Sequence, residues 1–405
     1  MKTIVTSIAA GCLLGALAIA QTPTYTVTDL GAVGPSGQPF VITNNGLVSG
    51  AAAFPDNTLR AVLWYKGRKL DIGSPGLQGP NSMAIGVNAW GQAVGEAQTS
   101  ALDPLGEDFC GFKALGLPST GTTCLPFLGQ YGVVTPLPTL GGNNGVANQI
   151  DNRGDVAGMA ENATPDPACP APQVLQFKPV VWGHGRIREL PTYPGDPDGA
   201  AFAINDDGQV AGASGDCTAF NPISLVNLRP LHALLWQNGG VTDLGNLGGT
   251  GHGNGIEAVG LNNRGQAIGN SDLTGDTNFH AFLWTAETGM RDLGTLPGDA
   301  NSAANGINDA GDVVGVSLDA NFNPRAFLRQ TGVTAGLTDL NTLIPAGSPL
   351  FLITGCSINS HGEIIGIAVD SSGDLHGYLA TPTNIATQAG HDRQMLVPRL
   401  GSRGR

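Results

Sequence analysis

The sequence predicts an all-β fold, and three observations carry this prediction. The chain of 405 residues contains 61 Gly and 27 Pro, only 13% of its residues are charged, and no long amphipathic helical pattern occurs. A phrase of the form Ile-Asn-x-x-Gly-x-x-x-Gly recurs seven times. A second phrase, typified by His-Ala-Phe-Leu-Trp, follows it and leads to Asp-Leu-Gly. Together these patterns predict a seven-bladed β-propeller of four-stranded antiparallel blades.

Residues 1–20, MKTIVTSIAAGCLLGALAIA, have the features of a secretory signal peptide. Lys2 precedes an apolar run, and Ala18-Ile19-Ala20 matches an A-x-A cleavage site. Lipid attachment at Cys12 is the alternative, but most of the apolar run follows this residue, whereas a lipoprotein signal needs it before. No other stretch is apolar over the roughly 18 to 20 residues of a membrane span. We therefore expect a secreted bacterial protein that is periplasmic or extracellular.

The Ile-Asn phrase is expected to form the first hairpin of each unit. A short apolar run ends in Asn or Asp, a Gly that can adopt positive φ follows, and apolar residues then alternate. The first Gly of the seven copies lies at positions 46, 91, 154, 208, 265, 311 and 362, so the units are spaced 45 to 63 residues apart. The second phrase and Asp-Leu-Gly form a second hairpin, which gives four strands a, b, c and d in each unit. Units of this length are typical of propeller blades rather than of parallel-strand coils, whose repeats are shorter.

The two ends of the mature chain are expected to meet in the last blade. Unit seven has strands near Ile353, near Ile364 and at 376–380, but no Asp-Leu-Gly follows them. The missing phrase stands at residues 25–31, YTVTDLG. We expect this N-terminal strand to complete the seventh blade, which removes an exposed sheet edge. The propeller then occupies residues 21–380, and residues 381–405 form a disordered tail.

With these phrases the chain resembles the HAF repeat proteins of bacterial secretomes, named for a His-Ala-Phe sequence that is His280, Ala281 and Phe282 here. The match covers nearly the whole mature chain. The resemblance implies an extracellular or envelope protein, and it transfers no catalytic residue.

Charged residues recur at matched places in the second hairpin. The first position of the His-Ala-Phe phrase is basic in six units, the Asp-Leu-Gly phrase is acidic in six, and unit two lacks both. This joint absence indicates that the two residues are cross-strand partners. The predicted structural pairs include Arg60 with Asp71, His232 with Asp243, and His280 with Asp292. A metal-binding ring of histidines is the alternative, but these residues lie in different blades, and Arg and Lys cannot ligate a metal.

Five cysteines remain after cleavage, and export permits disulfides. Cys110 and Cys124 bracket a short loop and form the first expected bridge, and Cys169 with Cys217 is the second. Cys356 is left over in an apolar strand-like run, where we expect a buried free thiol.

Two b–c loops place acidic side chains at spacings that calcium could use. They hold Asp272 and Asp276 in one unit, and Asp370 and Asp374 in another. Neither loop has the full D-x-[DN]-x-[DN]-G register, so turn formation is the main interpretation and calcium the alternative. We expect no cofactor and no other metal site. Trp90 is a separate binding candidate, because it occupies a turn position where an exposed aromatic is unusual.

The b–c loops at residues 96–123, 159–177 and 213–230 are long and enlarge one sector of one face, and the four paired cysteines fall within this sector. Loops on a rigid scaffold commonly carry binding sites, so we expect a binding face here; neutral surface insertions are the alternative. The expected function is a non-catalytic binding or scaffold module at the cell envelope or outside the cell. The alternative is a propeller hydrolase or lyase that acts on extracellular polysaccharide and needs two carboxylates. Residues that depart from the repeat, such as His252, Glu257 and His361, have no evident catalytic partner in the sequence.

The charge pattern limits the partners. The formal net charge is −13, without long acidic or basic blocks. Nucleic acid and anionic membranes are bound by clustered Lys and Arg, so both are excluded as expected partners. An extracellular protein or a glycan is the expected partner, and the chain is expected to be a monomer.

Overall fold

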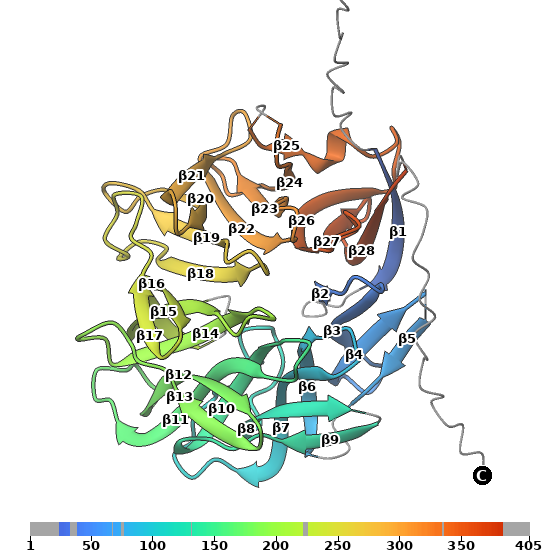
Figure 1. Cartoon of the computed structure of the whole chain (residues 1–405). Helices are drawn as coiled ribbons and strands as arrows, with labels where there is room; N and C mark the ends of the chain where they lie inside the picture. Colours follow the sequence, from blue (N-terminus) through green and yellow to red (C-terminus); the bar gives the residue numbers. More distant parts are fainter. Residues whose placement is uncertain are drawn as a thin grey trace, which may run out of the picture.

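The repeats fold into seven four-stranded antiparallel sheets around a common centre (Figure 1), as the sequence predicts. The structure, a computed structural model, describes residues 24–32, 39–66, 68–73, 77–130, 132–221, 226–333 and 336–383. The predicted signal peptide at 1–20 and residues 384–405 of the predicted tail lie outside the described residues. Thr381 and Pro382, which the sequence prediction assigned to the tail, belong to the last strand of the chain.

Six blades follow chain order, and the seventh combines both ends of the chain. The blades are β2 (Pro39–Ile42), β3 (Leu47–Ala53), β4 (Leu59–Tyr65) and β5 (Arg68–Asp71); β6 (Gln78–Val87), β7 (Ala93–Leu102), β8 (Thr122–Gln130) and β9 (Val133–Pro136); β10 (Gly141–Ile150), β11 (Val156–Pro165), β12 (Leu175–Gly183) and β13 (Arg186–Glu189); β14 (Asp198–Ile204), β15 (Val210–Phe220), β16 (Asn227–Gln237) and β17 (Gly240–Asp243); β18 (Ile256–Leu261), β19 (Ala267–Asp272), β20 (Phe279–Thr285) and β21 (Gly289–Gly294); β22 (Asn301–Ile307), β23 (Val313–Leu318), β24 (Pro324–Arg329) and β25 (Thr338–Asp339); and β26 (Leu350–Ile358), β27 (Ile364–Asp370), β28 (Leu375–Pro382) and β1 (Tyr25–Ala32).

Strand β1 closes the ring, as predicted. It pairs antiparallel with β28 from Tyr25 opposite Pro382 to Ala32 opposite His376. In Figure 1 the dark blue β1 lies beside the red β28. The backbone N–H of Thr383 donates to the carbonyl of Thr24 at 2.8 Å and extends the pairing by one residue. The outer edge of the last blade is therefore covered by β1, and the first strands of consecutive blades contact one another around the whole centre.

The asparagine of the Ile-Asn phrase explains why the phrase recurs. In blade five the Asn262 Oδ1 accepts the backbone N–H groups of Arg264 and Gln266, each at 3.0 Å, and so shapes the turn. Its Nδ2 donates to the carbonyl of Asn308 in the next blade at 2.9 Å. The same side chain thus builds its own hairpin and links two neighbouring blades.

The two glycines of the phrase have different roles. Gly265 adopts a φ of 70°, which the turn requires and which L side chains rarely adopt. Gly269 lies on strand β19 with ordinary φ, but a Cβ there would lie 1.9 Å from the carbonyl oxygen of Glu257. The first glycine is needed for its backbone conformation, and the second lets strands β18 and β19 approach closely.

The tryptophans that end the third strands pack between blades. Trp182 lies in a buried cluster with Val94 of the preceding blade, and its Nε1 donates to the carbonyl of Pro138 at 2.7 Å. Trp236 packs against Val181 of blade three in the same way. The indoles of Trp182 and Trp236 therefore cover the face of the neighbouring sheet, and their N–H groups are hydrogen-bonded.

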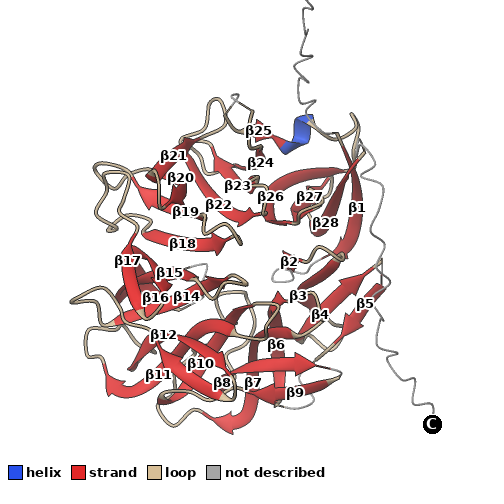
Figure 2. Cartoon of the chain, in the orientation of Figure 1, coloured by secondary structure: helices blue, strands red, loops and turns tan. Residues whose placement is uncertain are grey.

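Helix is almost absent from the described part of the chain. Figure 2 shows strands and loops throughout, with one short helical turn next to β25. This turn is the 3-10 segment Leu340–Thr342. Within the described residues, the structure contains no helix with the length and apolar composition needed to cross a membrane.

Candidate functional site

The disc has two faces with different chemistry. The turns that join strands a to b and c to d emerge on one side, which we call the turn face. The b–c loops and the connections between blades emerge on the other side, which we call the insertion face. The long loops of blades two, three and four lie on the insertion face.

The centre of the turn face is a polar cavity of about 180 Å³. Its rim comes from the Ile-Asn phrases of all seven blades. Five of the phrase asparagines donate Nδ2 to the backbone carbonyl of the next blade at 2.9 to 3.1 Å; they are Asn88, Asn205, Asn262, Asn308 and Asn359. Because so many of its polar groups bond to one another, this rim mainly holds the blades together.

Two carboxylates at this rim are close to the cavity. The Nδ2 of Asn263 lies 3.4 Å from the Oδ2 of Asp206 and 3.2 Å from the Oδ2 of Asp309, so one amide bridges both acids. Each acid also accepts a backbone N–H of a neighbouring blade at 2.9 Å. Asp206 and Asp309 are half-buried and line the cavity.

Trp90 lies beside the rim and is 58% exposed. Its indole Nε1 donates to the carbonyl of Asn152 in the next blade at 2.9 Å. This hydrogen bond fixes the orientation of the indole, although most of the side chain faces solvent. A fixed and exposed aromatic ring next to amide and carboxylate groups could stack against a flat or apolar ligand surface. Trp90 does not line the cavity itself.

The β7–β8 insertion turns inward instead of standing on the surface. Phe109 is 3% exposed and Phe112 is fully buried, in one cluster with Met83, Val146 and Phe202 from the inner strands of blades two, three and four. We call residues 103–121 the plug. The predicted surface loop is therefore partly a core element, because its aromatic residues cover apolar inner strands that would otherwise face water.

Both predicted disulfides are present, and both hold the enlarged sector. Cys110 and Cys124 join the plug to β8, with a sequence separation of 14. Cys169 and Cys217 join the β11–β12 loop of blade three to β15 of blade four, with a separation of 48. The second bridge thus fixes two neighbouring blades to each other on the insertion face.

Cys356 is a free thiol that is half-buried rather than fully buried. Removal of water around the sulfur raises the pKa of Cys356 to about 12, so the group stays a neutral thiol at ordinary pH.

The basic and acidic residues of the second hairpin meet across strands in several blades. The Nδ1 of His280 lies 2.9 Å from the Oδ2 of Asp292, and Arg60 Nη1 lies 3.2 Å from Asp71 Oδ2. In the closing blade the Nδ1 of His376 lies 2.9 Å from Asp29 Oδ2, and this contact raises the pKa of His376. These contacts join the third and fourth strands of their blades.

The predicted partner of His232 is wrong. Its Nδ1 lies 2.9 Å from the Oδ2 of Asp196, and its ring stacks on Tyr193 with 3.7 Å between centroids. Asp243 instead accepts the backbone N–H of Gly245 at 2.9 Å. The reason is the connection between blades three and four, which brings Tyr193 and Asp196 over the histidine and supplies a nearer carboxylate.

The acids considered for calcium are used by the loops themselves. Asp272 is fully buried, and its two oxygens accept the backbone N–H groups of Gly253, Asn254 and Gly255 at 2.8 to 3.2 Å. Asp276 accepts the N–H of Thr250 at 2.7 Å. Residues 250–255 therefore wrap around these two carboxylates.

The second pair behaves similarly. Asp370 accepts the backbone N–H groups of Ser372 and Asp374 at 2.8 and 2.9 Å. Among the described residues, none of these four acids belongs to a group of three ligand-type side chains within metal-binding distance.

A set of buried acids surrounds the base of the plug, and the sequence analysis missed it. Glu107 of the plug accepts the N–H groups of Val174 and Leu175 through Oε1 at 2.6 and 3.0 Å. Glu161 of β11 accepts the N–H groups of Asn143 and Asn144 through Oε2 at 3.0 and 2.9 Å. The other oxygen of each acid has no hydrogen-bond donor among the described residues.

The electrostatics of this set follow from its burial. Burial and the neighbouring Glu107 carboxylate raise the pKa of Glu161 to about 8, and burial also raises the pKa of Glu107. Glu96, beside the Cys110–Cys124 bridge, is buried as well, and burial holds its pKa well above the usual range. These acids are closed off from solvent, so they join the plug to blade three and do not form an open catalytic pair.

The residues that depart from the repeat are not brought together. Glu257 is buried and accepts the Nδ2 of Asn221 at 2.9 Å, and burial raises its pKa to about 7. The Nδ1 of His252 lies 3.0 Å from the hydroxyl of Thr250. The backbone N–H of His361 donates to Asn359 in the turn of blade seven. Glu257 and His252 belong to blade five and its entry loop, and His361 to blade seven.

Comparisons with known proteins define no family for this chain. No family model matches it, and no curated protein matches it. Among solved structures, TolB from Acinetobacter baumannii is similar with a TM-score of 0.34 and 10% identity over 88% of this chain and 55% of that chain. A fucose-specific lectin from Aleuria aurantia gives 0.33 and 10% over 90% and 97%. Trypanosoma rangeli sialidase gives 0.36 and 9% over 88% and 59%. The chain thus spans little more than half of the TolB structure, and likenesses this low carry no functional argument.

Proposed function

We propose that this protein is a secreted, non-catalytic binding or scaffold module of the HAF repeat kind that acts at the cell envelope or outside the cell. The two disulfides are compatible with an oxidising compartment. The expected partner is an extracellular protein or a glycan.

The observation that carries this proposal is a rigid insertion face with exposed apolar side chains. Leu102 is 75% exposed, Leu105 is 45% exposed and Phe220 is 49% exposed, all on the enlarged sector of blades two and four. The backbone that holds them is fixed by the buried plug and by the two bridges. Exposed apolar groups on a rigid surface lose little entropy on binding, which favours recognition of a partner.

A binding screen with matched variants tests this proposal. The mature chain is screened against glycans and envelope proteins, and captured partners are then measured with Leu102→Ser/Leu105→Ser/Phe220→Ser. The control is Val133→Ser/Val241→Ser, which alters exposed apolar residues on the turn face. We expect the triple variant to lose at least about tenfold in affinity, because three apolar side chains that the partner would bury are removed. The control should bind as tightly as the wild type. Equal affinity of the triple variant and the wild type would place the binding site elsewhere.

The alternative function is a hydrolase or lyase that acts on extracellular polysaccharide. The observation that favours it is the pair Asp206 and Asp309, which line the central cavity and share the amide of Asn263. Release of soluble sugar from polysaccharide by the wild type, with loss in Asp206→Asn and Asp309→Asn, would establish this alternative. No release across a polysaccharide panel, together with capture of a partner, supports the binding module.

A further inference from the structure

One position in the repeat departs from its counterparts at the boundary between blades three and four. At three other boundaries an asparagine at the start of an inner strand accepts a backbone N–H from the third strand of the preceding blade. These contacts are Leu59 to Asn81, Cys124 to Asn144 and Phe279 to Asn301, at 2.8 to 3.1 Å. At the boundary between blades three and four, the backbone N–H of Phe177 donates to the carboxylate of Asp198 at 3.0 Å. An aspartate therefore stands where these three boundaries have an asparagine.

The neighbouring boundary shows what the asparagine supplies. The Nδ2 of Asn144 donates to the Oδ2 of Asp103, the first residue of the β7–β8 insertion, at 2.8 Å. Asp166 is the counterpart of Asp103 in the next blade, because it also begins a b–c insertion. Each of the two accepts an N–H from the residue two positions later, at 2.7 Å for Leu105 and 2.9 Å for Ala168. An asparagine at 198 would have an N–H to offer Asp166, whereas an ionised aspartate has none.

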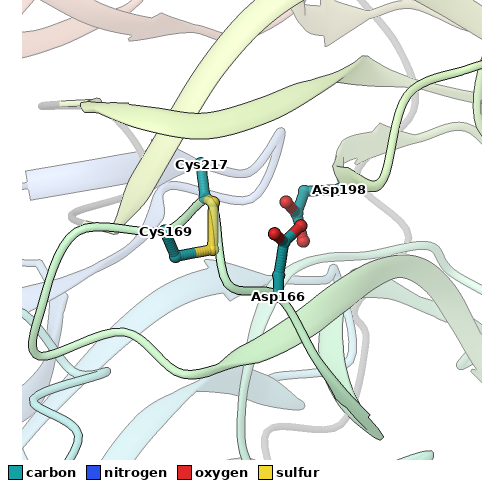
Figure 3. A group of neighbouring side chains, drawn as sticks. All are labelled: Asp166, Cys169, Asp198 and Cys217. Carbon is teal, nitrogen blue, oxygen red and sulfur yellow. A yellow bond between two sulfur atoms is a disulfide. The ribbon is translucent and has the colours of Figure 1, made fainter.

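Asp198 and Asp166 face each other in a closed site. Figure 3 shows their carboxyl groups pointing toward each other beside the Cys169–Cys217 bridge. Ligand oxygens of the two acids lie within 4.8 Å of each other, Asp198 is fully buried and Asp166 is 8% exposed. The Oδ2 of Asp198 has no hydrogen-bond donor among the described residues. Two ionised carboxylates that lie this close together and are shielded from water repel each other strongly.

A metal ion does not fit this cluster in the disulfide form. The two sulfurs that lie near the acids are bonded to each other and supply no thiolate, and the two carboxylates alone offer fewer than the six or so oxygen ligands that Ca²⁺ or Mg²⁺ takes. The other charged groups that act on Asp198 are Lys178 and Asp216. The Nζ of Lys178 donates to the carbonyl of Pro197, and among the described residues it forms no ion pair or hydrogen bond with the Oδ2 of Asp198. A proton is the remaining cation that satisfies the Oδ2 of Asp198.

We propose that Asp198 carries a proton that it donates toward Asp166, and that this carboxyl clamp is a pH-sensitive link between the disulfide-bearing β11–β12 insertion and blade four. The protonated Oδ2 replaces the amide N–H that Asn144 supplies at the preceding boundary. Loss of this proton leaves two facing carboxylates, so the insertion opens more often. The link therefore holds at low pH and weakens as the pH rises.

The pH range follows from the burial of the pair. Burial raises the pKa of Asp198 from 3.8 to about 7, and the Asp166 carboxylate adds to the rise. A group with a raised pKa in the closed state contributes stability that is fully present below its open-state pKa, and this stability is lost as the pH rises through the closed-state pKa. The clamp thus weakens between about pH 4 and pH 7 and is ionised above that range.

Hydrogen exchange of residues 166–174 at pH 5.5 and 8.5, corrected for the intrinsic exchange rate at each pH, tests the clamp. With a closed-state pKa near 7, we expect protection in the wild type to fall roughly thirtyfold between these two pH values. In Asp198→Asn the amide recreates the arrangement of Asn144 and Asp103, so protection should be high and nearly the same at both. Asp216→Asn, which removes a nearby negative charge outside the pair, should keep most of the pH dependence of the wild type.

Two results would overturn the clamp. One is protection of residues 166–174 in the wild type that does not change with pH. The other is an Asp198→Asn variant that is as pH-dependent as the wild type. An infrared spectrum gives an independent readout on the folded protein. The wild type at pH 5.5 should show the carbonyl stretch of a buried protonated carboxyl group, Asp198→Asn should lose its share of that band, and an unchanged band would also contradict the proposal.

Discussion

Truncation of Phe112 to Ala tests whether the β7–β8 insertion is a core element. Phe112 is fully buried in the cluster that includes Met83, Val146 and Phe202. Loss of a buried aromatic side chain removes about 150 to 200 Å² of apolar contact, or roughly 4 kcal/mol at 25 cal/mol per Å². Measured Phe-to-Ala substitutions in cores fall in the same range of about 3 to 5 kcal/mol. We therefore expect Phe112→Ala to lower the free energy of unfolding by about 4 kcal/mol.

Urea denaturation followed by tryptophan fluorescence measures this change, because the buried tryptophans lie between the blades. Ser119→Ala is the control, since Ser119 lies in the same insertion and is exposed. Its unfolding midpoint should match that of the wild type. A loss below about 1 kcal/mol in Phe112→Ala would show that the insertion is a surface loop, and the description of the plug would then be wrong.

Three further changes test separate parts of the structure. Glu161→Gln supplies an N–H toward Glu107. Because the raised pKa of Glu161, about 8, gives stability that is lost as pH rises, we expect the wild type but not the variant to lose roughly 3 kcal/mol between pH 6 and 9 in urea titrations. Cys110→Ser/Cys124→Ser opens a loop with a separation of 14, and the free energy of unfolding should fall by about 3 kcal/mol, with no fall contradicting a structural bridge. Asn262→Ala removes a turn acceptor and the donor to the next blade, and thermal unfolding should show a loss of about 2 kcal/mol; an unchanged melting temperature would refute the linking role of the rim.

The features that repeat in the sequence are the ones that could be predicted. The seven Ile-Asn phrases mark the blades, and the absent Asp-Leu-Gly after residues 376–380 points to the strand at 25–31. Cross-strand partners such as Arg60 and Asp71 also recur at matched places in the two phrases, so the sequence indicates their contact. The local pattern of apolar and turn residues predicts each hairpin, and the number of hairpins predicts the number of blades in the ring.

The features that depend on contacts between blades could not be read from the phrases. The Phe112 plug lies in an insertion without a period, so nothing in its pattern shows that it turns inward. His232 meets Asp196 because of the path of one connection. Asp198 did leave a signal, because an alignment of the blades at Asn144 shows aspartate in place of asparagine. Its partner Asp166 comes from another blade, and only the structure shows that the two acids meet.

Hydrogen exchange of the backbone amides in β1 is the most direct test of the closed ring. The account predicts that residues 25–32 exchange as slowly as those of β28, because the two strands form one ladder and the Tyr25 N–H also donates to the carbonyl of Leu343 at 2.8 Å. Exchange of residues 25–32 at the rate of an unstructured peptide, while β26 to β28 remain protected, would contradict a ring closed by its first strand.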